Sequence, residues 1–331
     1  MSGNRADGER GEAAGPFLEI ACDESGSDGE NLTGGNTDVF AHAGVSLPEA
    51  TAAAIVREIR DRIRSPAEEY KANHLLREKH RVVLEWLLAP DGPIHGQARV
   101  HLMEKTYFVV DRAVSLLLDD PAGAVTLFRV GRRTVGEDGW RAFLAAANHL
   151  LRVRHDGDPV EGFYGTVDTL RRAHPGTDAA EILERLAATR PRAEAYRAGF
   201  LDAPPLIPVL NPLLPAIVRT AVLWSGDGRP VRLVHDRQNM LTPDRIAWIE
   251  DTARRAGARL AGVRLVVARD DTRVQVADFL AGIARKIASD ELNGRGDPAL
   301  TALLRPYVDP ASVWGDVRSR ALLAAPVAGR W

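Results

Sequence analysis

The spacing of apolar residues predicts strands near both ends of the chain and helices between them. Residues 17–22 and 39–47 are apolar runs of strand length, and the glycine-rich segment between them predicts a hairpin-like loop. Residues 97–103 alternate polar and apolar side chains, as a half-buried strand does. Two further strands are expected, a short one over residues 231–234 and a buried one over residues 263–268.

Apolar residues at helical spacing predict the helices that separate these strands. The first helix begins at Pro48 and places Ala52, Ile55, Ile59 and Ile63 on one face. The other expected helices cover residues 75–88, 107–118, 140–153, 160–173, 179–188, 193–201, 212–224, 243–257 and 274–287. Thr242 is expected to cap the helix that follows it. Because strands and helices alternate after residue 212, we expect parallel strand pairing in an α/β sheet.

These elements predict a mixed sheet flanked by helices, with a helical insertion. Residues 1–16 are polar and are expected to be a disordered tail. Residues 17–135 and 206–297 would form the core. Residues 136–205 have no strand period and would form a helical insertion or cap. Residues 298–331, which contain Trp314 and Trp331, are expected to pack on the core.

Composition sets limits on function. A chain of 331 residues with 45% hydrophobic and 27% charged residues is typical of a globular protein with a sizeable core. The formal net charge of -2 excludes a generally basic nucleic-acid-binding surface, although a local basic groove is compatible with it. The single cysteine, Cys22, excludes an intramolecular disulfide. Since no leader pattern and no apolar run of roughly 20 residues occurs, we expect a cytoplasmic protein without a membrane span.

Two acidic fragments carry the clearest sign of chemistry. Asp23, Glu24, Ser25 and Gly26 directly follow the first apolar run, and Asp278 lies three residues after Gln275 at the start of the last long helix. Residues three apart on a helix face the same way. Carboxylates held by rigid elements far apart in sequence are how a fold builds a divalent-metal site for phosphoryl chemistry.

The order of these motifs resembles the DUF3800 family. The matching features are a strand ending in D-E-S-G, a later E-x-K, a strand-terminal aspartate and a Q-x-x-D on a helix. Here these are Asp23 to Gly26, then Glu69 with Lys71, then Asp236, and finally Gln275 with Asp278. The likeness covers about residues 17–120 and 205–290. It implies a ribonuclease H-like fold, a divalent-metal site and nuclease chemistry.

In such a site two Mg²⁺ or Mn²⁺ ions would be held by carboxylates that converge in space. Asp23 would bridge both ions, Asp236 and Asp278 would each hold one, and Glu69 would complete the second. Glu24 ranks below them as a metal ligand, because strand alternation turns it to the other side of the sheet. The residues expected to contact substrate are Lys71, Gln275 and Ser25.

Simpler explanations exist for each fragment taken alone. Asp23 and Glu24 could belong to a turn, Gln275 and Asp278 to a helix start, and Asp236 to an Asx turn with Asn239. Two function classes therefore remain open. One is a metal-dependent nuclease or related phosphodiester hydrolase acting on DNA or RNA; the clustered carboxylates favour it. The other is a non-catalytic ribonuclease H-like scaffold that binds nucleic acid or a partner protein; the near-neutral charge and sparse lysines favour it.

Overall fold

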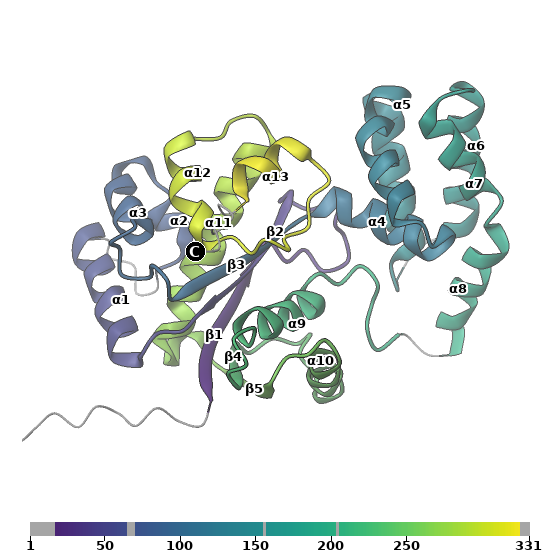
Figure 1. Ribbon diagram of the computed structural model, residues 1–331. Helices are drawn as coiled ribbons and strands as arrows, with labels where there is room; N and C mark the ends of the chain where they lie inside the picture. Colours follow the sequence, from purple (N-terminus) through teal and green to yellow (C-terminus); the bar gives the residue numbers. More distant parts are fainter. Residues whose placement is uncertain (1–16, 65–69, 155–156, 203–204, 325–331) are drawn as a thin grey trace, which may run out of the picture.

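The computed structural model describes residues 17–64, 70–154, 157–202 and 205–324 (Figure 1). In these ranges the chain is an α/β protein built on a five-stranded mixed sheet flanked by helices, which confirms the expected fold class at this level. The strands are β1 (Leu18–Ser25), β2 (Val39–Val45), β3 (Ala98–Glu104), β4 (Val231–Asp236) and β5 (Leu260–Val266). They lie in the order β3-β2-β1-β4-β5.

The central strand β1 joins an antiparallel half of the sheet to a parallel half. It pairs antiparallel with β2, which pairs antiparallel with β3. On its other side it pairs parallel with β4, which pairs parallel with β5. One end of the sheet therefore carries the carboxyl ends of β1, β3 and β4 together with the start of β2. Both strand-terminal aspartates of the sequence analysis belong to this end of the sheet.

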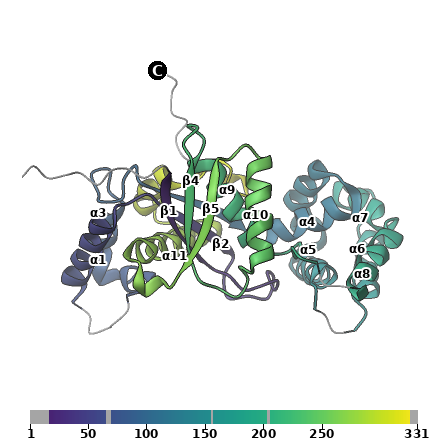
Figure 2. The same cartoon turned by 90° about the horizontal axis from the view of Figure 1, so that it is seen from below.

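Helices cover both faces of the sheet (Figure 2). On one face lie α1 (Glu49–Ile63), α2 (Ala72–Leu75), η1 (Glu78–His80), α3 (Arg81–Leu88), α11 (Thr272–Leu292) and α12 (Pro298–Leu304). The other face carries α9 (Leu213–Trp224) and α10 (Pro243–Arg255), and η2 (Ala268–Asp270) follows β5. As expected, Thr242 caps α10 by accepting a hydrogen bond from the Arg245 amide at 3.5 Å. The helix α11 runs along β1: the Arg273 Nη1 atom in its first turn lies 2.9 Å from Glu19 near the start of β1, and the Arg285 Nε atom lies 3.0 Å from the Ser25 hydroxyl at its end.

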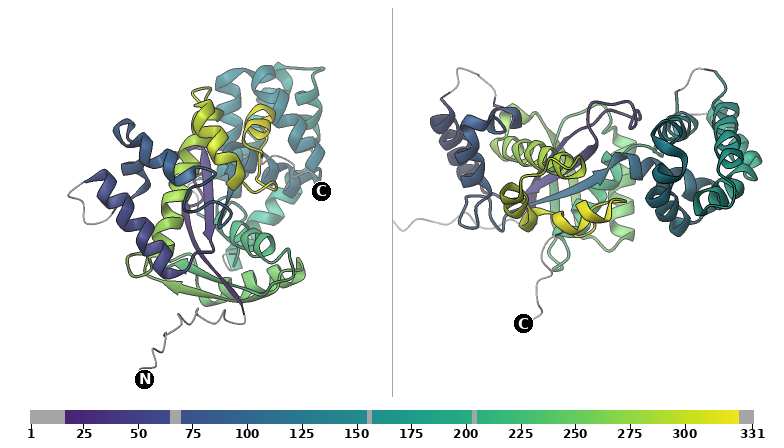
Figure 3. Two further views of the ribbon diagram at one scale, coloured as in Figure 1. Left: turned by 60° about the vertical axis from the view of Figure 1, so that its left-hand side comes forward. Right: turned by 90° about the horizontal axis from the view of Figure 1, so that it is seen from above.

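A helical lobe lies beside the sheet (Figure 3). It contains α4 (Lys105–Leu118), α5 (Pro121–Leu151), α6 (Pro159–Ala173), α7 (Asp178–Ala187) and α8 (Arg190–Asp202). The helix α5 begins well before residue 136, where the insertion was expected to start, and it bends at Gly136, whose φ is 74°. Gly131 lets the helix fold against Trp140, since a Cβ there would lie 2.4 Å from the indole ring. The apolar core of the lobe is continuous with the core under α9.

Three details of the sequence prediction are wrong. Residues 75–88 are not one helix, because Arg77 is extended (ψ 137°) and separates α2 from η1 and α3. Strand β5 starts earlier than residue 263 and is only partly buried, because it forms an edge of the sheet. Residues Asp23 to Ser25 do not form a turn, since they continue β1 and pair with β2; the turn begins at Gly26, whose φ is 85°.

The C-terminal segment packs along the outer edge of β3. After α12 the chain forms η3 (Arg305–Tyr307) and ends its described part with α13 (Val317–Leu323). Between these elements Val313 donates its amide hydrogen to the Leu102 carbonyl at 2.8 Å and accepts one from Glu104 at 2.9 Å. These bonds satisfy backbone groups that an edge strand would otherwise expose. Trp314 is buried, and Trp331 lies outside the described residues.

A buried asparagine of α5 holds the loop between β1 and β2. The Asn148 Oδ1 atom accepts hydrogen bonds from the amides of Leu32 at 2.8 Å and Thr33 at 3.1 Å, and its Nδ2 donates to the Glu30 carbonyl at 2.8 Å. Asn148→Ala should lower the free energy of unfolding by about 1–3 kcal/mol, because it strands buried polar groups. Urea unfolding measures the change, with Asn31→Ala in the exposed part of the same loop as control. Equal stability of the two variants would contradict this role.

Candidate carboxylate site

Asp23 is the centre of the candidate site. It is only 6% exposed, and strand alternation puts its side chain on the same face as Ala21, the face covered by α11. Its Oδ1 atom accepts a hydrogen bond from the Glu24 amide at 2.8 Å. Burial raises the pKa of Asp23 to about 9, and the negative charges of Glu24, Asp278 and Asp236 contribute in the same direction. Without a cation, this carboxyl group is therefore protonated at neutral pH.

The structure brings Asp236 and Asp278 to the same place. In the parallel pair of β1 and β4, Cys22 lies opposite His235, so the next residues, Asp23 and Asp236, are neighbours on one face. The Ala268 amide donates a hydrogen bond to the Asp236 Oδ1 atom at 2.9 Å. Asp278 reaches the cluster from α11, and it is close enough to raise the pKa of Asp23. Two strands and a helix thus place three carboxyl groups close enough for Asp236 and Asp278 to affect the pKa of Asp23.

Lys71 lies at the outer side of this carboxylate cluster. Its Nζ atom is 3.6 Å from the Asp278 Oδ2 atom, and the two side chains are 49% and 18% exposed. The approach is close because α11 has Gly282 where it crosses α2; a Cβ at that position would lie 2.3 Å from the Ala72 Cβ. Glu69, the fourth predicted ligand, lies outside the described residues.

The two remaining predicted substrate contacts are engaged within the protein. The Gln275 Nε2 atom donates to the carbonyl groups of Ala268 at 3.4 Å and Arg269 at 3.3 Å, so this amide holds the loop after β5. The Ser25 hydroxyl accepts a hydrogen bond from the Arg285 Nε atom at 3.0 Å. Both interactions fasten α11 to the ends of the parallel strands, and neither side chain completes the carboxylate cluster.

Glu24 points to the opposite face of the sheet, as strand alternation predicts. There its Oε2 atom accepts a hydrogen bond from Gln238 at 2.7 Å and lies 3.9 Å from the His235 Nε2 atom. The residue is therefore separated from Asp23 by the backbone of β1, although its charge still raises the pKa of Asp23. A direct role as a metal ligand together with Asp23 is not supported by this geometry.

Behind the site, two buried histidines form a hydrogen-bonded chain that the sequence analysis missed. His42 Nδ1 lies 2.8 Å from the Thr220 hydroxyl, His42 Nε2 lies 3.1 Å from His235 Nε2, and His235 Nδ1 lies 2.9 Å from the Asp236 carbonyl oxygen. Because a carbonyl only accepts, His235 carries its proton on Nδ1, so His42 donates through Nε2 and Thr220 donates to His42. Burial lowers the pKa of His42, which keeps the His42 imidazole neutral. The chain fixes the backbone that carries Asp236.

The chemistry of the cluster suits a hard divalent cation. Its donors are carboxylate oxygens, which Mg²⁺ and Mn²⁺ prefer. Among the described residues, no three side chains of His, Cys, Asp or Glu are already arranged around a point that could hold a metal ion. Mg²⁺ is commonly bound by one or two carboxylates together with waters and substrate phosphates, so Asp23 with Asp236 or Asp278 suffices for such a site.

Comparisons of this chain with models of protein families, with curated proteins and with solved structures found no significant match. The likeness to DUF3800 therefore rests on the motifs of the sequence. Within the ranges that the structure describes, no helix is both long enough and apolar enough to cross a membrane.

Proposed function

We propose that this protein is a ribonuclease H-like, Mg²⁺- or Mn²⁺-dependent phosphodiester hydrolase of the DUF3800 type that acts on nucleic acid. The observation that carries the proposal is the convergence of Asp23, Asp236 and Asp278 from two adjacent parallel strands and the helix packed on them. Burying several acids at one point costs free energy in the absence of a cation. A bound divalent ion offsets that cost, which favours a metal site over a purely structural cluster.

Each residue of the site would have a separate role in hydrolysis. Bound cations would stabilise the charge of the phosphodiester and lower the pKa of the attacking water. Asp23 would hold the cations from the floor of the site, while Asp236 would keep its orientation through the Ala268 amide and the histidine chain. Lys71, beside Asp278, would bind a phosphate oxygen as a point charge. Glu69, two residues before Lys71, is the candidate for the remaining ligand.

One observation favours the second candidate, a scaffold that binds nucleic acid or a partner protein without cleaving it. Lys71 already pairs with Asp278, and Asp23 is protonated at neutral pH, so the cluster is partly neutralised without a metal. Such a cluster can persist in the folded protein without a bound cation. The two proposals differ in a single property, which is metal-dependent turnover.

A cleavage assay tests the proposal. Wild-type protein should cleave at least one of labelled single-stranded or double-stranded DNA or RNA with Mn²⁺ and none with EDTA. Asp23→Asn keeps the shape of the side chain and removes its charge, so we expect a loss of at least about a hundredfold in rate. Asp91→Asn, at an exposed position, serves as the control. Cleavage that persists in EDTA or in Asp23→Asn would refute the mechanism; binding without any cleavage would support the scaffold.

A further inference from the structure

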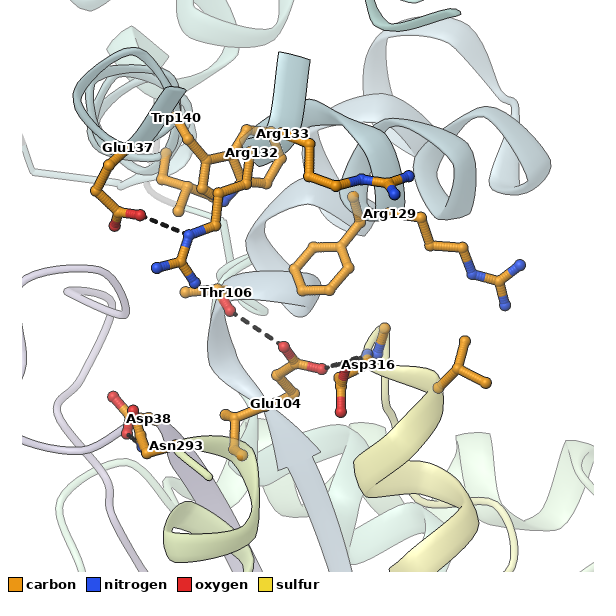
Figure 4. A pocket seen from close by; sticks show the side chains of 15 residues that line it. Asp38, Glu104, Thr106, Arg129, Arg132, Arg133, Glu137, Trp140, Asn293 and Asp316 are labelled. Carbon is orange, nitrogen blue, oxygen red and sulfur yellow. Dashed lines mark hydrogen bonds and ion pairs between the residues drawn. The ribbon is translucent and has the colours of Figure 1, made fainter. Parts of the chain in front are cut away.

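A cavity of about 570 Å³ lies between the helical lobe and the sheet (Figure 4). Its walls come from α5, from the end of β3, from the end of α11 and from residues 315–317. We call it the arginine cavity, because Arg129, Arg132 and Arg133 of α5 line it together with Phe128 and Trp140. Its size is in the range of sites that hold small organic ligands.

The acidic residues in the wall of the arginine cavity are engaged by other groups of the protein. Asp38 accepts hydrogen bonds from the Ser289 hydroxyl at 3.0 Å and from the Asn293 amide at 2.6 Å. Glu104 accepts the backbone amides of residues 315 and 316 at 2.9 and 3.0 Å, and burial raises its pKa to about 7. Glu137 pairs with Arg132 at 2.5 Å (Figure 4). Asp316, the fourth acid of the wall, accepts a hydrogen bond from the Ser319 amide at 2.6 Å. Because the donors to Asp38 and Asp316 are neutral, these two carboxylates keep their negative charge, so an anion would bind beside arginines that have no acidic partner.

Two arginines of the cavity have no acidic partner. Within the part of the chain that the structure describes, no carboxylate lies within ion-pair distance of Arg129 or Arg133, and both side chains are exposed. They are four residues apart and so lie side by side on α5. Arg320 lines an adjoining hollow together with Arg129. A bound anion stabilises neighbouring positive charges that have no counter-charge. A guanidinium group can also donate two parallel hydrogen bonds to the oxygens of one phosphate.

The rest of the wall includes two aromatic side chains that meet edge to face, with ring planes 68° apart. The rings of Phe128 and Trp140 have centroids 6.2 Å apart. Gly315 lies against Phe128, since a Cβ there would come within 2.4 Å of the ring. The Thr106 hydroxyl, in the first turn of α4, lines the cavity and donates a hydrogen bond to Glu104 at 3.4 Å. Trp140 is buried and stacks on Phe143, so the half-buried Phe128 is the ring of this pair that a base could contact beside the arginines.

The arginine cavity lies at the same end of the sheet as the carboxylate cluster. Glu104 lies opposite Val39 and Ser25 lies opposite Ala41, so the ends of β3 and β1 are at the same side. The helix α11 connects the two sites, with Asp278 near its start and Asn293 at its end. At 1.5 Å per residue this separation is about 22 Å. A short stretch of single-stranded nucleic acid is long enough to reach from one site to the other.

We propose that the arginine cavity binds a nucleoside phosphate, with its phosphate on Arg129 and Arg133 and its base against Phe128. The nucleoside phosphate is either a free nucleotide or one unit of a single strand. Binding of a strand rests on the proposed nuclease function, whereas binding of a free nucleotide is independent of it. The sequence shows no phosphate-binding glycine loop, so the site would bind phosphate through side chains instead of a helix N-terminus.

Direct binding in EDTA tests this proposal without requiring cleavage. The probes are ATP and a fluorescein-labelled single-stranded DNA of about eight nucleotides, and the protein carries Asp23→Asn in all samples. Arg129→Gln/Arg133→Gln should weaken binding by about tenfold or more, since it removes both phosphate contacts. The control, Arg254→Gln/Arg255→Gln, removes the same charge from exposed positions of α10. Thermal unfolding verifies that both double variants fold.

Each outcome is decisive. Binding of ATP that only the cavity variant loses supports a free nucleotide, and the same selective loss for the oligonucleotide supports a unit of a strand. The proposal is overturned if neither probe binds at millimolar concentration, or if both double variants weaken binding equally. Because cleavage is measured separately, a protein that binds nucleotide in the cavity without cleaving nucleic acid would refute the nuclease proposal and leave this one standing.

Discussion

Replacing Asp23 with asparagine should raise the free energy of unfolding of the metal-free protein at pH 7 by about 2–4 kcal/mol. The reason is the raised pKa of this carboxyl group, about 9 in the folded protein against the ordinary value of 3.8. At pH 7 the folded protein must hold a proton that the unfolded chain releases, and this difference favours unfolding. Asparagine carries no such proton, so it removes the penalty.

The stability difference between Asp23→Asn and the wild-type protein should depend on pH. A group whose pKa is raised on folding contributes stability below its unfolded pKa and loses that contribution as the pH rises to the folded value. The advantage of Asp23→Asn over wild type should thus be small near pH 4 and should grow toward pH 9, by at most about 1.4 kcal/mol per pH unit. Urea unfolding at several pH values measures it, with Asp91→Asn as control. A difference that does not change with pH would contradict the raised pKa.

Divalent cations should reduce or cancel the stability advantage of Asp23→Asn over the wild-type protein. A cation binds the ionised carboxylate, so it competes with the proton on Asp23 and binds more tightly as the pH rises. Mn²⁺ at a hundred times its dissociation constant would stabilise the wild-type protein by about 2.7 kcal/mol. Asp23→Asn should gain much less. Thermal unfolding with Mn²⁺ and with EDTA therefore tests metal binding before any substrate is known.

The elements that position this site could be predicted because each has a clear apolar period. The run before Asp23, the strand before Asp236 and the helix that carries Asp278 were all expected from the sequence, and all three exist. The alternation of strands and helices after residue 212 also favoured parallel pairing, which β4 and β5 confirm. What the sequence could not supply is the register. The neighbouring positions of Asp23 and Asp236 depend on a one-residue alignment that only the folded sheet fixes.

Features formed by distant segments were not predictable in the same way. His42 and His235 belong to apolar strands, and nothing in either strand alone indicates that the two rings meet. The arginine cavity combines α5 with the ends of β3 and α11, while its arginines resemble other surface arginines in the sequence. Gly131 and Trp140 likewise meet across a kink in α5, where the backbone leaves the helical conformation at Gly136 (φ 74°).

A second buried charge, with a large expected effect on stability, lies against the loop between β1 and β2. Lys105, at the start of α4, is fully buried, and its ammonium group donates hydrogen bonds to Asp28 and, at 2.5 Å, to the Thr37 hydroxyl. Thr37 in turn donates to Asp28 at 2.9 Å. Asp28 also lies close to Arg285, which holds Ser25 beside the carboxylate cluster. The loop and the site are thus connected through one carboxylate.

Asp28→Ala should lower the free energy of unfolding at pH 7 by about 3–5 kcal/mol, because it leaves the Lys105 ammonium buried without its counter-charge. Burial already lowers the pKa of Lys105, and the loss of Asp28 would lower it further. A base whose pKa is lowered on folding costs stability below its unfolded pKa, so the defect should shrink as the pH approaches 10. Urea unfolding at pH 7 and pH 9.5 measures both effects.

A second substitution separates the buried charge from simple loss of contacts. Lys105→Met in the Asp28→Ala background replaces the unpaired ammonium with an apolar chain of similar length, and it should restore most of the lost stability. Asp138→Ala breaks an ion pair with Arg141 in which both side chains are largely exposed, so it should change stability little. If Lys105→Met adds to the loss instead of reversing it, the buried charge is not the cause. In that case the hydrogen bonds of the loop itself, and not the counter-charge that Asp28 supplies to Lys105, would hold this end of the sheet in place.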